Sequence, residues 1–154
     1  MKWIYMGKIV LFIQIFCAVS HGQSPDCKDF INSKYFKLSK PGDFKQYGQS
    51  KGIPVVVRKT YTFEIVFVGK NEYKMGIATE SDYEPIHIRM IDKKTNKVLF
   101  DNKKYQYMGS VSFYIEKTSM ISVEVTVLAI DEPFILPEDV RVCLGIKIYN
   151  QSVD

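Results

Sequence analysis

The stretch Ser119–Ile130, SMISVEVTVLAI, decides the fold. Apolar residues occupy every second position from Ile121 to Ala129, and polar residues such as Ser122 and Glu124 fall between them. Successive side chains of a β-strand point to opposite faces, so this alternation predicts a long strand with one apolar face. Its β-branched residues are stiff about χ1 and fit a pleated surface, which favours a central strand over a helix.

Other stretches alternate in the same way. Val55–Val68 is interpreted as one long extended segment, and the turn Gly69–Asn71 predicts that it pairs in a hairpin with the next strand. Asp92–Asn96 predicts another hairpin, because asparagine tolerates the left-handed conformation of such turns. The alternation Val140–Ile148 gives the last strand. Seven to nine short strands joined by polar turns predict an all-β fold, an antiparallel two-sheet sandwich of the jelly-roll kind.

The first residues have the order of a secretory signal peptide. Met1–Lys8 carries two lysines and no acid, Ile9–Ala18 is almost entirely apolar, and small residues follow. We predict cleavage after Ser20, with Gly22 as the second choice; the alternative is an uncleaved N-terminal anchor. The apolar run is shorter than the roughly 20 residues that a membrane-spanning helix needs, so no permanent span is expected.

The chain therefore divides into four parts. We predict a signal peptide over residues 1–20, an N-terminal strap over 21–52, a β-sandwich over 53–150 and a tail over 151–154. The strap is expected to contain a short edge strand within Phe44–Gln49, and Pro54 is expected to break the pairing after it, because proline lacks the backbone donor. In the last strand, Cys143 and Gly145 fall opposite the apolar face and leave a shallow strip, over which the strap could lie.

Two cysteines, Cys27 and Cys143, remain after the predicted cleavage. In a protein outside the reducing cytosol they indicate one disulfide, which would attach the strap to the last strand. The alternative is two unpaired thiols.

Composition limits the classes of partner. Loss of Lys2 and Lys8 with the signal peptide lowers the formal net charge from +4 to +2, and acids and bases are interspersed. A surface balanced in this way lacks the field that nucleic acids or anionic membranes would require. The expected partner is therefore a protein or a glycan, with no nucleic acid and no cofactor.

No motif indicates catalysis. His87 is the one histidine left if His21 is trimmed, and it alternates outward on a strand, where a solvated histidine is ordinary. Glu64 and Glu124 could lie side by side on the outside of a sheet, but nearby lysines would balance them. Two cysteines and one histidine do not make a four-ligand zinc site, so no metal and no enzyme activity are predicted.

Tyrosines give the best functional indication. Several fall in loops or out of phase with the core, and tyrosine is enriched where a surface meets a partner, because its ring is apolar and its hydroxyl polar. We predict a binding patch of Tyr83, His87, Tyr105 and Tyr107. The alternative is that these rings cover the ends of the sandwich.

Seven short stretches resemble a group of small exported β-sandwich proteins of Bacteroidota-type bacteria, which have no assigned activity: Tyr47–Ser50, Lys59–Tyr61, Thr79–Glu80, Tyr83–Ile86, Val98–Asn102, Val123–Val127 and Arg141–Gly145. The hairpin stretch Ile91–Asp101, IDKKTNKVLFD, is loosely similar to pre-peptidase C-terminal and other jelly-roll accessory domains. The resemblance implies export and a β-sandwich, and it transfers no catalytic residue.

The sequence thus predicts an exported, non-enzymatic β-sandwich, periplasmic or extracellular, that binds another protein or acts structurally in the cell envelope. The alternative function is a carbohydrate-binding module that uses surface tyrosines. It is less favoured because Trp3, the one tryptophan, leaves with the signal peptide.

Overall fold

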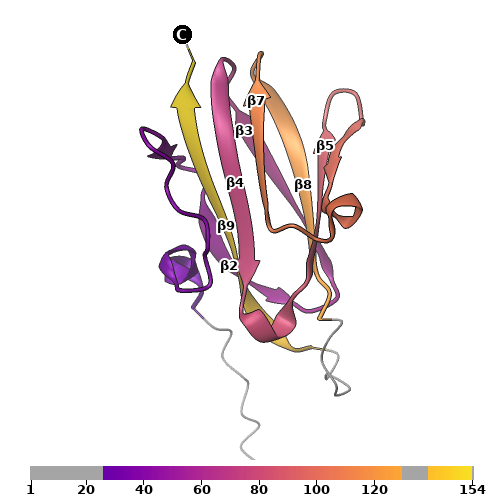
Figure 1. The fold of residues 1–154 in the computed structure, drawn as a ribbon. Helices are drawn as coiled ribbons and strands as arrows, with labels where there is room; N and C mark the ends of the chain where they lie inside the picture. Colours follow the sequence, from indigo (N-terminus) through magenta and orange to yellow (C-terminus); the bar gives the residue numbers. More distant parts are fainter. Residues whose placement is uncertain (1–25, 130–138, 154) are drawn as a thin grey trace, which may run out of the picture.

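The computed structural model describes residues 26–129 and 139–153, so the predicted signal peptide and most of the segment before the last strand lie outside the described residues. The described chain forms strands joined by short 3₁₀ helices (Figure 1). In chain order they are η1 (Lys28–Asn32), β1 (Lys45–Gln46), β2 (Lys51–Val56), β3 (Thr60–Phe67), β4 (Asn71–Thr79), η2 (Ser81–Tyr83), β5 (Ile86–Asp92), β6 (Val98–Asp101), η3 (Asn102–Tyr105), β7 (Ser110–Ile115), β8 (Ser119–Val127) and β9 (Arg141–Ser152).

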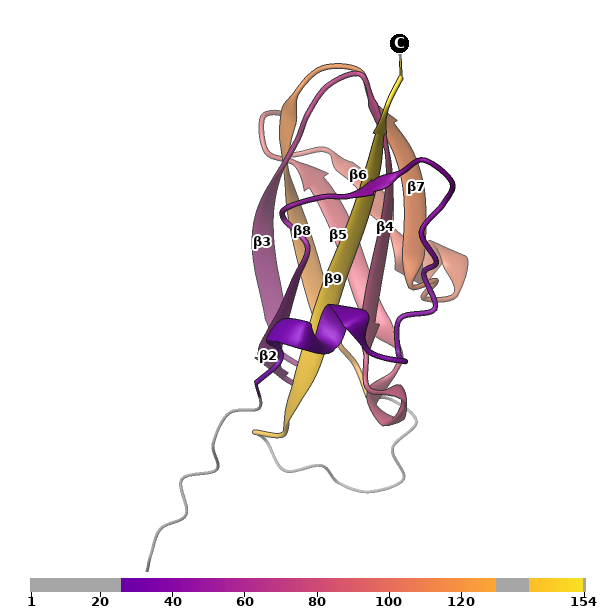
Figure 2. The same ribbon diagram turned by 90° about the vertical axis from the view of Figure 1, so that its left-hand side faces the viewer.

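The strands form two antiparallel sheets packed face to face (Figures 1 and 2). One sheet has the order β1-β9-β4-β7, with β2 also paired to β9, and the other has the order β3-β8-β5-β6. The pairs β2–β9, β3–β8, β4–β7 and β5–β6 are nested like the two arms of one long hairpin that has been rolled up. This is the jelly-roll arrangement, and the predicted fold class is confirmed.

The rolled topology corrects two local predictions. Val55–Val68 is not one strand, because the chain crosses between the sheets after β2 and Arg58 takes a left-handed φ of 65° there. The turn Gly69–Asn71 does not close a hairpin either, since β3 and β4 belong to different sheets. Among the described strands, β5 and β6 are the one consecutive pair that is hydrogen-bonded to each other, so the predicted hairpin at Asp92–Asn96 is present. Asn96 has a φ of 57° there.

Two buried or half-buried tyrosines hold these crossings. The hydroxyl of Tyr61 accepts a hydrogen bond from the Val56 N–H (2.8 Å), and that of Tyr73 accepts one from the Val68 N–H (2.8 Å). Each tyrosine thus returns to the backbone five residues upstream, at the end of the preceding strand. Burial raises the pKa of the Tyr73 hydroxyl, which is 1% exposed.

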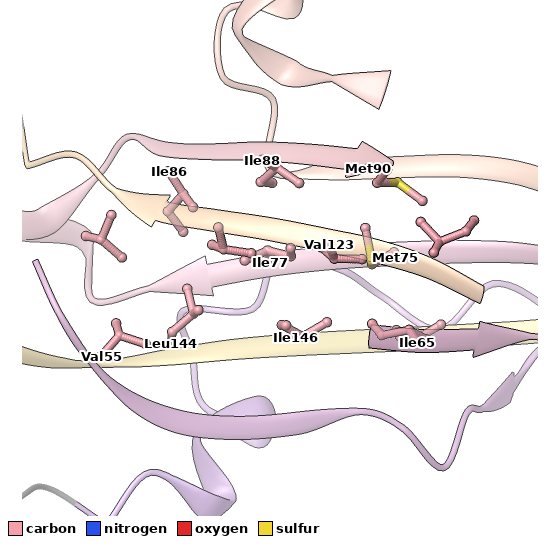
Figure 3. Close-up of a cluster of buried hydrophobic side chains, with 14 of the residues drawn as sticks. Val55, Ile65, Met75, Ile77, Ile86, Ile88, Met90, Val123, Leu144 and Ile146 are labelled. Atoms are coloured by element: carbon pink, nitrogen blue, oxygen red, sulfur yellow. The ribbon is translucent and has the colours of Figure 1, made fainter. Parts of the chain in front are cut away.

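The core fills the space between the sheets. Met75 and Ile146 of one sheet face Ile88 and Val123 of the other, and all four are at most 2% exposed (Figure 3). The stretch that decided the fold is therefore central, with β8 between β3 and β5. Ser122 was predicted to be exposed, but it is buried. Its side chain is short and lies on a central strand, so the larger side chains of the strands on either side exclude water from it.

Strand β2 also differs from the prediction. Its pairing with β9 continues through Pro54, which is opposite Cys143, and β1 is shorter than the predicted edge strand. Both strands lie at the edge of their sheet, where a proline is tolerated because one side of the strand has no partner.

Within the predicted strap, the segment from Cys27 to Ser39 lies across the outer face of the sheet that contains β9, and the name strap is kept for this segment from here on (Figure 2). The predicted disulfide is present and joins Cys27 to Cys143 of β9, with 5.3 Å between the Cα atoms. Glycines let the strap approach closely: a Cβ at Gly145 would collide with the Phe36 ring, and one at Gly76 would lie 2.8 Å from the Leu38 side chain.

We expect Gly145→Ala to lower the free energy of unfolding by roughly 1–3 kcal/mol, because the added methyl group forces the Phe36 ring off the sheet. Urea unfolding followed by circular dichroism measures the change. Gly48→Ala is the control, since a Cβ there meets nothing within 4 Å. Equal stability of the two variants would contradict this account of the strap.

Candidate functional site

A groove lies on the outer face of the sheet beside the strap. Its floor is formed by the small residues Gly76 and Ala78, which alternate outward along β4 while Met75 and Ile77 point into the core. Because these outward positions carry almost no side chain, the strap and the sheet leave a hollow of about 470 Å³. That volume is within the range of pockets that hold small ligands or single peptide side chains.

Three segments form the walls of the groove. One wall is Tyr35–Ser39 of the strap, and a second is Glu84–Ile86, where the chain enters β5. The third lies where the chain enters β7 and consists of Gln106, Tyr107, Gly109 and Ser110. Lys37 and Lys74 add positive charge to the lining, and Glu84 adds one negative charge. The groove therefore combines aromatic, amide and charged groups, with one more base than acid.

Asn102 fixes the wall next to β7. Its side chain is fully buried, accepts a hydrogen bond from the Ile88 N–H (2.8 Å) and donates to the carbonyl oxygens of Ile86 (2.8 Å) and Met108 (3.2 Å). Beyond the end of β6, the side-chain amide thus makes the hydrogen bonds to β5 that another strand residue would make. Its bond to Met108 anchors the end of the loop.

Two non-glycine residues of this loop are held in left-handed conformations. Gln106 has a φ of 53° and Tyr107 one of 57°, which are uncommon values for side chains of this size. The Tyr107 N–H donates to the carbonyl oxygen of Asn102 (2.9 Å). Such backbone strain costs of order 1–3 kcal/mol and persists only where the surroundings enforce it. Here it places Tyr107 in the groove wall.

A polar chain runs from Tyr107 over the outer face of the second sheet. The Tyr107 ring packs edge-on against His87 (6.1 Å between centroids), and His87 Nε2 lies 2.9 Å from Asp101 Oδ1. Arg89 continues the chain, because it lies 4.0 Å from Asp101 and donates to Glu124 at 2.9 Å. The hydrogen bond from His87, together with the Lys103 N–H and the charges of His87 and Arg89, lowers the pKa of Asp101.

Asp101→Asn is expected to lower the free energy of unfolding at neutral pH by about 0.5–1 kcal/mol, a value reduced for partial solvent exposure. Because the folded state lowers the pKa of Asp101, its contribution is complete above the ordinary pKa near 4 and is lost as the pH falls through the lowered value. The stability difference between wild type and variant should therefore shrink below about pH 4. Urea titrations at several pH values measure it, with Asp43→Asn as the exposed control; a constant difference would contradict it.

The structure brings together only part of the predicted binding patch. His87 and Tyr107 are in contact, while Tyr105, in the same loop as Tyr107, stacks on Phe100 (5.7 Å) and is 54% exposed. Tyr83 packs against the core cluster. The patch stays a prediction, with Tyr107 the one member that lines the groove.

Each of the two carboxylates considered for catalysis forms an ion pair with a basic side chain. Glu64 pairs with Lys93 (2.6 Å) and Glu124 with Arg89 (2.9 Å), on the outer face of the sheet. Within residues 26–129 and 139–153 no group of three His, Cys, Asp or Glu side chains could hold a metal ion. The same part of the chain contains no helix long and apolar enough to cross a membrane.

Comparison with known proteins finds a likeness in structure and none in sequence. No family model matches the chain, and no curated protein matches it in sequence. Among solved structures it is similar to the crystal structure of Aeromonas hydrophila PliG, a periplasmic lysozyme inhibitor of g-type lysozyme. The identity is 8%, the TM-score is 0.47, and the match covers 74% of this chain and 93% of that one. At this similarity the match carries no argument about function.

Sequence reasoning placed the strap over Cys143 and Gly145 of β9 but did not extend it to β4, so the groove was missed. Tyr35–Ser39 has no helical or strand period, and nothing in its own pattern places it against β4. A usable signal lay in the small residues Gly76 and Ala78 at outward positions of β4, which leave room for covering side chains.

Proposed function

We propose that the protein is an exported, non-enzymatic binding protein that holds a segment of another protein in the groove between the strap and Tyr107. The observation that carries this proposal is the enforced placement of Tyr107, in a left-handed conformation, at a groove whose floor is made of small residues. Residues held in sparsely populated backbone conformations concentrate at binding sites, and a partner that uses the Tyr107 ring would account for its placement.

The lining favours a peptide segment. Tyr35 and Tyr107 offer rings for an apolar side chain, while Lys37 and Lys74 favour a neighbouring acid. Backbone groups of an extended segment could also bond to Gln106 and Ser110, which are polar and line the same wall.

Export is supported by two features. The Cys27–Cys143 disulfide is typical of compartments outside the reducing cytosol, and the first residues have the order of a signal peptide. We therefore propose that the protein acts in the periplasm or outside the cell.

A non-enzymatic role is supported by the state of the polar groups. The His87 imidazole is hydrogen-bonded to Asp101, and the hydroxyl of Thr126, on the strand beside it, is paired with that of Thr60 (2.8 Å). In the part of the chain that the structure describes, these contacts leave the imidazole without a hydrogen-bonded nucleophile to activate.

Selection from a displayed library of random peptides tests the proposal. We expect enriched peptides to combine an apolar side chain with an acid, and to lose at least about tenfold in affinity with Tyr107→Ala or Lys74→Glu. Tyr105→Ala is the matched control, because Tyr105 is in the same loop, is more exposed and does not line the groove.

A glycan array probed with the same proteins distinguishes the proposed peptide binding from the alternative, carbohydrate binding. Glycan binding that is lost with Tyr107→Ala, without peptide enrichment, would replace the proposal with a carbohydrate-binding module. Peptide binding that is unchanged by Tyr107→Ala and Lys74→Glu would place the site elsewhere and overturn the proposal.

A further inference from the structure

Strand β7 forms one edge of its sheet, and its composition is unusual for an edge strand. Its sequence, SVSFYI, contains no charged residue, no proline and no glycine. In the described chain β7 pairs only with β4, so its other side has no strand partner. An edge strand of this composition is open to pairing with another strand.

The other edges of the sandwich are protected. β2 carries Lys51 and Pro54, and β3 carries Glu64 in an ion pair with Lys93. β6 has four residues, ends in Asp101 and pairs through a register shift. Charge, proline, shortness and irregular register are the usual devices against edge-to-edge association, and β7 lacks all of them.

The register of β4 and β7 shows which backbone groups are free. The Ile77 N–H donates to the Gly109 carbonyl oxygen (2.8 Å), and hydrogen-bonded pairs alternate along an antiparallel ladder. Val111, Phe113 and Ile115 therefore turn their backbone groups to β4. Ser110, Ser112 and Tyr114 turn theirs away from the sheet.

We propose that this edge pairs with β7 of a second copy of the chain, antiparallel about a two-fold axis through Ser112. In that register Ser112 faces its own copy and Ser110 faces Tyr114 of the second copy, so every outward-turned N–H and C=O of these three residues has a partner. A two-fold axis also places like side chains near each other, which an uncharged strand tolerates and a charged one does not.

Side-chain size and burial agree with self-pairing. On the outer face the large Tyr114, 50% exposed, would lie beside the small Ser110. On the inner face Val111, Phe113 and Ile115 are only partly buried, in contrast to the buried Tyr73 and Met75 of β4. Pairing would cover this side of the core and join two sheets into one.

Sedimentation velocity over a concentration series tests the inference, which is independent of the proposed function. We expect the disulfide-bonded protein to form a reversible dimer, because a six-residue strand makes a small interface. Ser112→Lys places two ammonium groups at the axis and should weaken the dimer at least about tenfold. Ser112→Pro removes an N–H that faces away from β4 and should abolish it.

Thr62→Lys, an exposed substitution on the edge strand β3, is the control and should dimerise like the wild type. Circular dichroism checks that each variant is folded, and Ser112→Lys decides the question if the proline variant is not. A wild type that stays monomeric at the highest concentration, or a Ser112→Lys variant that dimerises unchanged, would overturn the inference.

Discussion

The double variant Cys27→Ala/Cys143→Ala is expected to lose up to about 4.7 kcal/mol in free energy of unfolding. The bridge closes a loop over a sequence separation of 116 residues, so it restricts nearly the whole unfolded chain. It also fastens the strap, which contacts the sheet through other side chains as well, among them Phe30 and Phe36 at Gly145 and Leu38 at Gly76.

Urea unfolding of oxidised wild type and double variant measures this loss, and limited trypsin digestion locates it. Lys34, Lys37 and Lys40 are exposed on or beside the strap and should be cut first once the bridge is absent. Gly145→Leu is the matched control, because it displaces Phe36 and keeps the disulfide. If it proves as destabilising as the double variant, the strap packing and not the covalent bond supplies the stability.

Asn102→Ala is expected to cost roughly 3 kcal/mol, because it leaves three buried or half-buried backbone groups without their partner. The Ile88 N–H and the Ile86 carbonyl oxygen lie at the edge of β5, where water cannot easily replace the amide. The loop should loosen as well, since the bond to Met108 is lost and Tyr107 is no longer held against the groove.

Thermal unfolding measures the loss, with the exposed Asn32→Ala as the control. Asn102→Asp gives a sharper test, because its carboxylate would face two carbonyl oxygens and could not donate to them. Its destabilisation should decrease at acidic pH, where a protonated carboxyl group donates again. An Asn102→Ala variant as stable as Asn32→Ala would show that the buried amide has no structural role.

Alternation was sufficient to predict the fold class. Period-two patterns place side chains correctly where a strand is half-buried, as in β3, where exposed and covered residues alternate from Thr60 to Phe67, because burial on one face is a local property of the sequence. The disulfide followed from the number of cysteines, and the Asp92–Asn96 hairpin from a turn residue that tolerates positive φ.

Connections and the groove were harder to predict, because they depend on contacts between distant residues. The turn at Gly69–Asn71 looks like a hairpin turn, but β3 pairs with β8 and β4 pairs with β9. The two strands beside the turn therefore join different sheets, through partners that lie far away in the sequence. Asn102 appeared to be one polar loop residue among several. Its role is visible only once β5 has been placed beside it.

The position of β9 has a consequence for biosynthesis. β9 lies between β2 and β4, yet it follows every strand of both sheets in the chain. Until Arg141–Ser152 joins the fold, the first sheet lacks an interior strand, and the edges of β2 and β4 that pair with β9 stay exposed. A chain that ends before Arg141 should therefore aggregate, while the chain that includes β9 should not.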